Sequence, residues 1–371
     1  MACGVQTISP SLVLVSRALF GIGYPGIFLL NCILVSKWFE EDGPNHTYLA
    51  LGMSLLATAY RSGTAINNLV SPRLSEHVSV QFAYWFGVGI CVCRVLCSLY
   101  ISSMERKRLF NQSQVDEGRP NPQVATNSIW QKVRSICQNL RAYPQMFWLL
   151  LTLIAMFYGV IAVSNSVSSA YLIGRLCNGL CCTDVETTCA AEQAAEDTAS
   201  FMMSIPLVFG IVLGPFIGIG IDHVGHMTLL LVGSTCLFSV AFALFAFSNI
   251  SVYYSLVAEG LSIAVFACAS WPCVPRVVEK SMIGVAFGLI ACAYSLALTL
   301  MPIFVSVFQE SYSSYESVQI LFFVLSCSMF ILSIYLWGLD YSNGRVFQEK
   351  STQSQERSTS RDTITSKGTE V

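Results

Sequence analysis

The chain has 371 residues and a formal net charge of −2, with 54% hydrophobic and 11% charged residues. Soluble domains carry about 25% charged residues, so this composition excludes an ordinary water-soluble enzyme or binding module. The Lys and Arg residues gather between apolar segments, which argues against a nucleic-acid partner. The lipid bilayer is therefore the expected environment.

Apolar segments of about 20 residues recur along the chain, and each is long enough to cross a hydrocarbon layer of about 30 Å. They lie at residues 11–36, 49–70, 80–103, 146–173, 200–221, 227–248, 251–274, 282–307 and 317–338. A span in lipid must satisfy its own backbone hydrogen bonds, and the alternation of barrel strands is missing here. We therefore predict an all-α polytopic membrane protein with about nine transmembrane helices.

The basic residues are sorted between the connections. Seven Lys and Arg residues lie between positions 106 and 141, whereas the next connection, 174–199, holds Arg175 beside five acidic residues. The positive-inside rule places the first connection in the cytosol. Alternation along the chain then predicts a cytosolic C-terminus.

The basic connection also divides the chain. We predict a partial N-terminal transmembrane bundle (1–103), a cytosolic linker (104–145), a C-terminal six-helix bundle (146–338) with a Cys-rich lumenal loop (174–199), and a disordered cytosolic tail (339–371). Three spans before the linker and six after it are typical of a two-times-six architecture built from repeats. We therefore expect the first three helices of such a fold to be missing from this sequence.

Charged side chains inside spans are costly and mark cavities or relays. Arg61 lies in a polar run that reaches Asn67, and its guanidinium can bind a substrate carboxylate through two parallel hydrogen bonds. Glu259 lies deep in its span and can bind a cationic group or a proton, or pair with an arginine to hold two helices together. Arg17 stands near the outer end of its span, and for Arg94 a structural role is favoured.

A short turn at residues 218–226 carries Gly218, Asp222 and Gly225, and its acid near a helix end predicts a gate. Upstream, glycines recur at a spacing of four, at 210, 214 and 218. This spacing predicts a face on which another helix packs closely.

Four cysteines fall together in the acidic outer connection, namely Cys177, Cys181, Cys182 and Cys189. Two disulfides are expected there, in one of three connectivities, and a zinc site is the competing interpretation. No catalytic triad, paired metal-binding histidines or phosphate-binding glycine loop is recognisable. We expect no enzyme activity, no metal and no cofactor.

Several of these segments resemble a known family. Residues 16–39, with Gly21-Ile22-Gly23, are similar to the fourth helix of major facilitator superfamily transporters. The run 61–67, the turn 218–226 and Trp271-Pro272 resemble the lysosomal dipeptide transporter branch of that superfamily. The resemblance implies uniporter-like transport of dipeptides or amino-acid-like solutes, a lysosomal or other endomembrane location, and a second copy or a lumenal glycoprotein subunit as partner.

The resemblance also assigns roles to residues. Arg61 matches the arginine that binds the peptide carboxylate, whereas the acid expected two residues after Gly-Ile-Gly is replaced, because Tyr24 and Pro25 follow Gly23. Tyr24 is therefore a candidate contact, and we hypothesise that Glu259 supplies the missing carboxylate. The turn shows His223 and His226 where the family signature has basic residues.

Two other functions stay open at this point. The fold alone does not choose the solute, so a carrier of sugars, organic anions or drugs is an alternative. The missing acid and missing helices also suit a non-transporting membrane protein that binds or regulates a partner.

Overall fold

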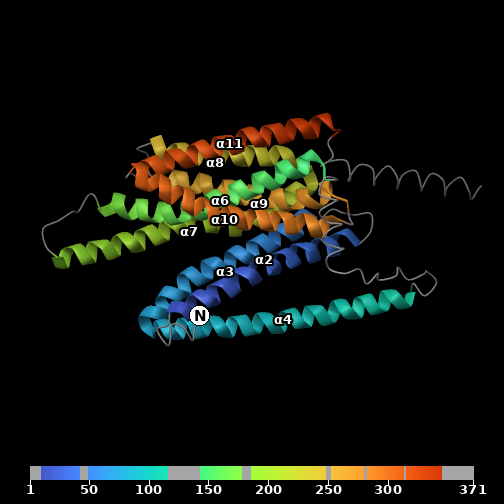
Figure 1. Cartoon of the computed structure of the whole chain (residues 1–371), viewed down its shortest axis with the longest axis horizontal. Coiled ribbons are helices and arrows are strands. Elements are labelled where there is room, and N and C mark those ends of the chain that lie inside the picture. The colour runs from blue at the N-terminus through green and yellow to red at the C-terminus, as the bar shows by residue number, and fades with distance from the viewer. Residues whose placement is uncertain are drawn as a thin grey trace, which may run out of the picture. The chain divides into compact units, whose positions relative to one another are not determined.

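A computed structural model of the chain describes residues 10–41, 49–115, 143–177, 185–247, 252–279, 282–312 and 315–344. Every regular element in these ranges is a helix (Figure 1). The helices are α2 (Pro10–Glu41), α3 (Leu49–His77), α4 (Val80–Val115), α6 (Gln145–Cys177), α7 (Val185–Val224), α8 (Met227–Phe247), α9 (Val252–Val277), α10 (Ile283–Tyr312) and α11 (Tyr315–Ser342). The predicted all-α fold class is confirmed.

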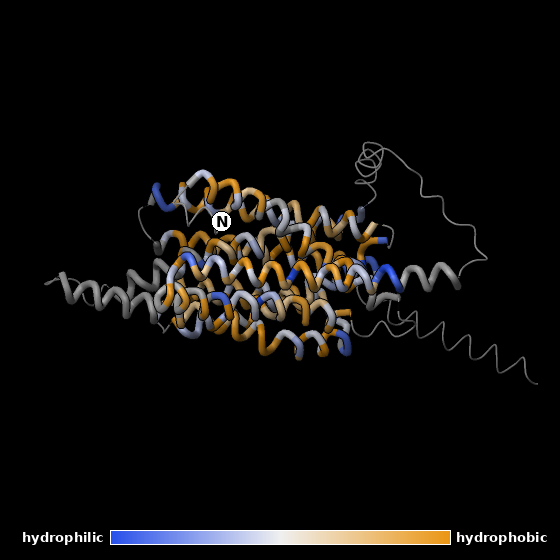
Figure 2. Tube along the Cα trace, turned by 90° about the horizontal axis from the view of Figure 1, so that it is seen from below, coloured by the Kyte–Doolittle hydropathy of each residue, from blue (hydrophilic) through white to orange (hydrophobic). Residues whose placement is uncertain are grey.

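Seven segments of the described helices are long and apolar enough to cross a bilayer. They are Val80–Lys107, Gln145–Asn165, Phe201–His223, Met227–Phe247, Val252–Val277, Ile283–Glu310 and Ser317–Ser342. Apolar residues predominate along these helices in Figure 2. Helices α2 and α3 also form but are not among the seven, so the expected count of nine stays a prediction.

The chain forms two compact units. One comprises residues 1–24 and 66–140, which include α4, and the other comprises residues 25–65 and 141–371. The larger unit thus holds α6 to α11 together with the adjoining parts of α2 and α3. All contacts described below lie within this larger unit.

Inside the larger unit, α9 packs against α7 and α8, α11 packs against α8 and α6, and α10 packs against α6. The rings of Phe157 on α6 and Phe266 on α9 stack with centroids 3.7 Å apart, and Phe238 on α8 lies 4.5 Å from Phe157. All three side chains are fully buried. Because lipid is as apolar as these rings, their close packing rather than exclusion from water holds the helices together.

Helices α4 and α7 extend furthest beyond the predicted spans. Helix α7 begins at Val185, within the expected loop 174–199, and α4 continues to Val115, within the expected linker. The added part of α7 is rich in Ala and Glu, which are good helix formers. Length and hydropathy detect only the membrane-crossing part of such a helix.

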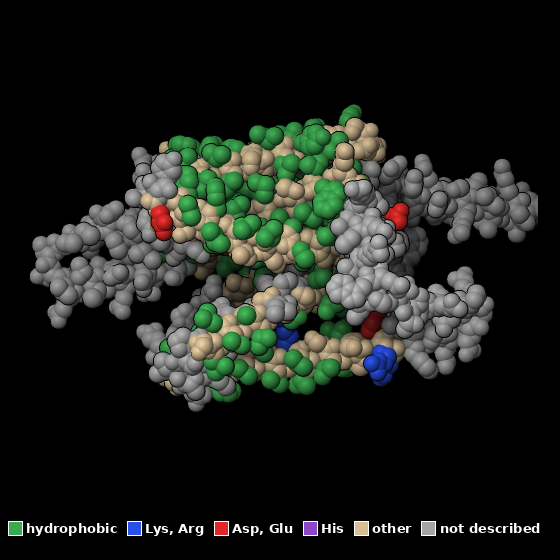
Figure 3. Space-filling view, in the orientation of Figure 1, with side chains coloured by type: hydrophobic (Ala, Val, Ile, Leu, Met, Phe, Trp, Pro, Cys, Tyr) green, Lys and Arg blue, Asp and Glu red, His purple; other side chains and the backbone are tan. Residues whose placement is uncertain are grey.

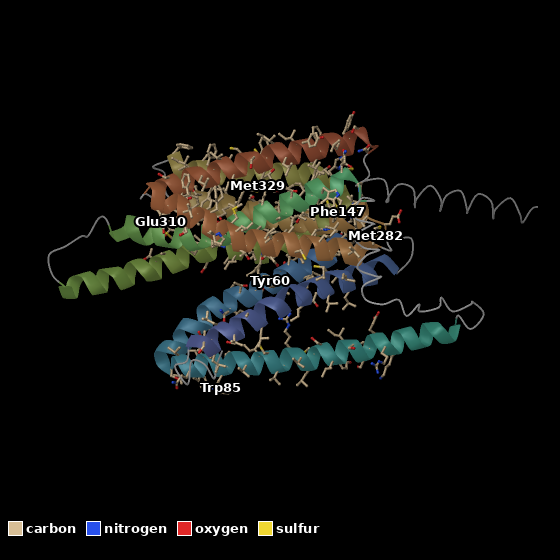
Figure 4. The ribbon with its side chains drawn as sticks, in the orientation of Figure 1. Tyr60, Trp85, Phe147, Met282, Glu310 and Met329 are labelled. Carbon is tan, nitrogen blue, oxygen red and sulfur yellow. The ribbon has the colours of Figure 1, made fainter. Side chains whose placement is uncertain are left out.

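Charged side chains on the described helices tend to lie near helix ends. In Figure 3 hydrophobic side chains are spread over the visible face of α10 and α11. Glu310 lies near one end of α10 and Met282 adjoins the other (Figure 4). At the Met282 end, the Tyr143 hydroxyl donates a hydrogen bond to the Met282 carbonyl at 3.3 Å, and burial raises the pKa of this tyrosine.

Candidate functional site

Arg61 lies near the middle of α3, next to the Tyr60 labelled in Figure 4, and is half-buried. Its Nη2 donates a hydrogen bond to the main-chain carbonyl of Ile263 on α9 at 3.1 Å. The guanidinium also lies directly against Gly210 on α7, because a Cβ atom placed on Gly210 would collide with it. The absence of a side chain at Gly210 thus makes room for the arginine.

Three aromatic side chains from α6, α9 and α10 contact one another, and one of them, Tyr158, interacts with Arg61. The indole of Trp271 on α9 donates a hydrogen bond to the Tyr158 hydroxyl on α6 at 3.0 Å. The ring of Tyr294 on α10 meets Tyr158 edge-on, with centroids 5.7 Å apart. The guanidinium of Arg61 interacts electrostatically with Tyr158 and with the Cys268 thiol. We call Arg61, Tyr158, Trp271 and Tyr294 the central cluster.

The charge of Arg61 is uncompensated in the part of the chain that the structure describes. A guanidinium has five N–H donors, and the structure shows one of them bonded to Ile263. No carboxylate among the described residues forms an ion pair with it. A cation held against membrane-crossing helices such as α7 and α9 without an anionic partner is costly, and an anionic group on a solute would offset that cost.

Glu259 occupies a different position on α9. Its side chain is 2% exposed, and Oε1 accepts a hydrogen bond from the Ser164 hydroxyl on α6 at 3.4 Å. Within the described residues Glu259 forms no ion pair with an arginine. These residues therefore do not support a structural ion pair that joins two helices through Glu259. Glu259 lies four residues before Ile263, which is about one helical turn from the carbonyl that Arg61 contacts.

The glycine stripe of α7 packs against α3, as its spacing predicts. Gly210, Gly214 and Gly218 face Arg61, Thr58 and Ser54 in turn. A Cβ atom on Gly214 would lie 2.5 Å from the Thr58 hydroxyl oxygen, and one on Gly218 would collide with the Ser54 side chain. The two helices can therefore approach this closely only because the positions are glycines.

Asp222, near the end of α7, binds the first turn of α3. Its carboxylate accepts hydrogen bonds from the backbone amides of Ala50 at 3.0 Å and Leu51 at 2.8 Å. Amides at a helix start have no partner within the helix, and a negative charge there is favourable. Gly225 then ends α7 with a φ of +70°, and its amide donates to the Ile221 carbonyl. Only glycine adopts this backbone conformation without strain.

The structure describes the other predicted residues only in part. Asn67 and Arg94 are exposed, on α3 and α4 respectively. The side chains of Arg17 and Tyr24 lie outside the described residues, as do those of the four cysteines expected to form disulfides, at 177, 181, 182 and 189. The nine cysteines whose side chains are described are free. The disulfide prediction therefore stays untested.

The sequence did not identify three residues of the cluster as site residues. Tyr158, Trp271 and Tyr294 each sit in an apolar span, where an aromatic residue gives no signal that separates packing from binding. Ser164 was missed for the same reason, because serine is common in membrane helices. Trp271 alone had a signal, in the Trp-Pro pair that carried the family resemblance.

A bundle of long apolar helices with charged residues held between them is a multi-pass integral membrane protein. The chain matches the family model of the Major Facilitator Superfamily over residues 1–176 and 167–363, and it belongs to that superfamily. The superfamily comprises solute transporters rather than enzymes, and its members act on small molecules from within a lipid bilayer. The expected family is confirmed.

Curated relatives point to one branch of the superfamily. The chain is 20% identical to the lysosomal dipeptide transporter MFSD1 of Homo sapiens over 332 residues, which is 86% of this chain and 63% of the relative. It is 20% identical over 341 residues to the same transporter of Danio rerio, covering 88% of this chain and 66% of the relative. For Gallus gallus the identity is 18% over 299 residues, covering 78% and 60%. The chain thus spans less than two thirds of the length of these relatives.

Proposed function

We propose that the protein carries small solutes that bear a carboxylate, in the first place dipeptides or related amino-acid-like solutes, across a membrane by facilitative, uniporter-like alternating access. The observation that carries the proposal is Arg61, a guanidinium near the middle of α3 with one hydrogen bond to a main-chain carbonyl and no carboxylate partner among the described residues. A solute carboxylate supplies the missing anion. Two parallel hydrogen bonds to the guanidinium give both affinity and orientation.

The aromatic residues support a solute with flat or apolar parts next to its carboxylate. Tyr158, Trp271 and Tyr294 come from three helices of the larger unit and contact one another, and Tyr158 interacts with the guanidinium. Rings of this kind offer rigid contact area together with polar edges. Asn67, Arg17 and Tyr24 stay candidate solute contacts in this proposal.

The gate in this proposal is the contact of Asp222 and the glycine stripe with the start of α3. Alternating access by rocking of two bundles requires that such contacts form on one side of the membrane and separate during the cycle. Hydrogen bonds to two backbone amides suit that task, because they add stability to one state without a covalent link. Gly218, Asp222 and Gly225 are the residues to which we assign this role.

Location, partners and organisation follow from the branch in this proposal. We assign the protein to the lysosomal or another endomembrane, with a cytosolic C-terminus and a linker at residues 104–145 between two bundles. A second copy or a lumenal glycoprotein subunit is the proposed partner. Two disulfides among the four outer cysteines would stabilise the lumenal side against proteolysis.

Uptake of a labelled dipeptide into proteoliposomes tests the function. The purified chain and a version extended to the length of its relatives are reconstituted, and each is compared with its Arg61→Ala variant. We expect saturable uptake that unlabelled dipeptides suppress and that Arg61→Ala abolishes. Competition by sugars or by organic anions without an amine would reassign the solute. Absence of flux for every solute, together with stable capture of a partner protein, would favour the non-transporting function.

A further inference from the structure

Tyr158 of α6 is held by aromatic rings from two other helices. Its ring lies 6.0 Å from those of Phe266 and Trp271 on α9 and 5.7 Å from that of Tyr294 on α10, measured between centroids. The contacts with Phe266 and Tyr294 are edge-on, a geometry that aromatic pairs favour. The ring therefore has little freedom to turn, and its hydroxyl group keeps a fixed position.

Close packing of α6 against α10 also fixes the backbone next to Tyr158. A Cβ atom placed on the following residue, Gly159, would lie 3.1 Å from the Ala297 Cβ atom and 3.2 Å from the Met301 Cγ atom. Ala297 comes three residues after Tyr294, which is about one helical turn. The same helix contact thus sets the distance between the two tyrosines. A group held in this way loses little freedom when it binds a ligand.

The Tyr158 hydroxyl accepts a hydrogen bond and still has its own hydrogen to donate. The indole N–H of Trp271 donates to the hydroxyl oxygen at 3.0 Å, and a phenol hydroxyl can donate as well as accept. Among the described residues no group accepts a hydrogen bond from Tyr158, and the neighbouring Cys268 thiol itself donates to the Gly214 carbonyl at 3.4 Å. Tyr158 is half-buried, so its unused donor stays accessible to a solute.

The unused donor belongs to the same site as Arg61. The two side chains lie close enough to interact electrostatically, and the guanidinium has N–H groups beyond the one bonded to Ile263. A carboxylate that forms two parallel bonds with a guanidinium keeps lone pairs for a third donor. The bond from Trp271 strengthens that donor, because hydrogen bonds in a chain polarise one another.

We propose that the Tyr158 hydroxyl is a second donor to the solute carboxylate, beside Arg61, and that Trp271 is a positioning residue that orients and polarises this hydroxyl. The inference rests on the proposed function and names residues that recognise its solute. It predicts a preference for solutes with a free carboxylate over their amides, because a bond to a charged acceptor is the stronger one.

Tyr158→Phe tests the donor, since it removes the hydroxyl and keeps the ring. Binding of one dipeptide with a free C-terminal carboxylate, and of the same dipeptide as its C-terminal amide, is measured by calorimetry on the purified protein. Affinity for the acid should fall about tenfold, as for a lost hydrogen bond to a charged group. Affinity for the amide should fall about threefold, because a bond to a neutral group is about half as strong.

Tyr335→Phe is the matched control for Tyr158→Phe, because it removes an exposed hydroxyl from α11. It should change neither affinity. Equal losses for acid and amide in Tyr158→Phe, or no loss for either, would overturn the donor role and leave the proposed function intact.

Trp271→Phe tests the positioning role, since it removes the N–H donor and keeps an aromatic ring. The ratio of acid to amide affinity should fall about threefold in the wild-type background. In the Tyr158→Phe background the same change should leave that ratio unaltered, because no hydroxyl remains to be oriented. A purely structural loss would lower both affinities alike. Additive effects on the ratio in the double variant would overturn the positioning role.

A probe without a peptide bond separates this inference from the proposed function. Phenylacetate has a carboxylate and a ring but no amine, so Glu259, which stays the candidate contact for a solute amine, does not contribute to its binding. Bound phenylacetate should shift the C–O stretching band of Tyr158 in infrared difference spectra, and Tyr158→Phe should remove that shift. If no dipeptide binds the wild type, the proposed function fails and this band still decides the role of Tyr158. An unshifted band, or no binding of phenylacetate, would overturn the inference.

Discussion

Two charged residues join α3 to the C-terminal bundle, and they do so in opposite ways. Asp222 accepts hydrogen bonds from the amides of Ala50 and Leu51, which begin a helix and have no partner within it. Arg61 donates one hydrogen bond to the Ile263 carbonyl in the middle of α9. The aspartate thus satisfies two backbone groups that need a partner, whereas the arginine makes one bond with a guanidinium that can make several.

The difference separates a structural contact of α3 from the contact to which we assign a function. A charge whose bonding capacity is met by the fold, as at Asp222, stabilises a conformation. A charge whose bonding capacity exceeds what the described residues supply, as at Arg61, is the one to which we assign solute binding in our proposal. Between the two lie Ser54 and Thr58, which pack on the α7 glycines and carry no charge. The following substitutions test this contrast.

Arg61→Ala should have the largest effect, a loss of solute affinity of about 100-fold, because two charge-assisted hydrogen bonds disappear. Arg61→Lys keeps the charge but not the planar fork, so an intermediate loss of about tenfold is expected. Binding measured by isothermal calorimetry on the purified protein checks both. Arg106→Ala, at an exposed position of α4, is the matched control. Equal solute affinity of the Arg61→Ala variant and the wild type would contradict the proposed carboxylate site.

Gly218→Ala and Gly220→Ala should shift stability in opposite directions although they lie two residues apart on α7. The new methyl group at Gly218 would meet the Ser54 Cβ atom at 2.8 Å and the Ala50 carbonyl oxygen at 3.2 Å, whereas at Gly220 nothing lies within 4 Å. The first change should cost about 1–3 kcal/mol through overpacking, and the second should gain up to about 1 kcal/mol of helix propensity. Thermal unfolding in detergent measures both, and equal melting temperatures would contradict the close approach of α3.

Asp222→Asn should cost about 1 kcal/mol, because an amide side chain has one acceptor oxygen for two backbone donors and no charge to favour the helix start. Since the contact stabilises one state of the proposed gate, uptake should change by a few-fold as well. His223→Gln, at the exposed neighbouring position, removes only an electrostatic attraction to Asp222 and should change both quantities less. A shift in melting temperature as large for His223→Gln as for Asp222→Asn would show that the carboxylate has no special role.

Thr58→Val should have the smallest effect on stability, and unlike most substitutions it should not destabilise the protein. The Thr58 hydroxyl oxygen is buried without a hydrogen-bond partner among the described residues, so its replacement by a methyl group should be neutral or stabilising by up to about 1 kcal/mol. Thr235→Val is the contrasting change, because the Thr235 hydroxyl shares a 2.7 Å hydrogen bond with Ser333. That variant should lose about 1 kcal/mol, as measured by thermal unfolding. A destabilised Thr58→Val would indicate that the hydroxyl has an acceptor after all.

Individual residues show which features could be predicted from the sequence. The depth of Arg61 and Glu259 followed from span length and the cost of buried charge, and the packing face of α7 followed from the glycine spacing. The residues that contact Arg61 and Glu259 could not be predicted in this way. Glu259 meets Ser164, which lies 95 positions away in the sequence, and Arg61 meets a backbone carbonyl 202 positions away. No local pattern encodes such pairs, because they depend on which helices become neighbours.

The amino-acid sequence alone was sufficient to predict an all-α membrane protein, because hydrophobic length and the cost of an unpaired backbone in lipid act locally. Which charges are satisfied depends on the tertiary structure. It brought the start of α3 to Asp222, left the Arg61 guanidinium with one main-chain partner, and enclosed Glu259 beside a serine. Those outcomes arise from packing between helices, whose energies depend on close contacts that a single segment does not contain.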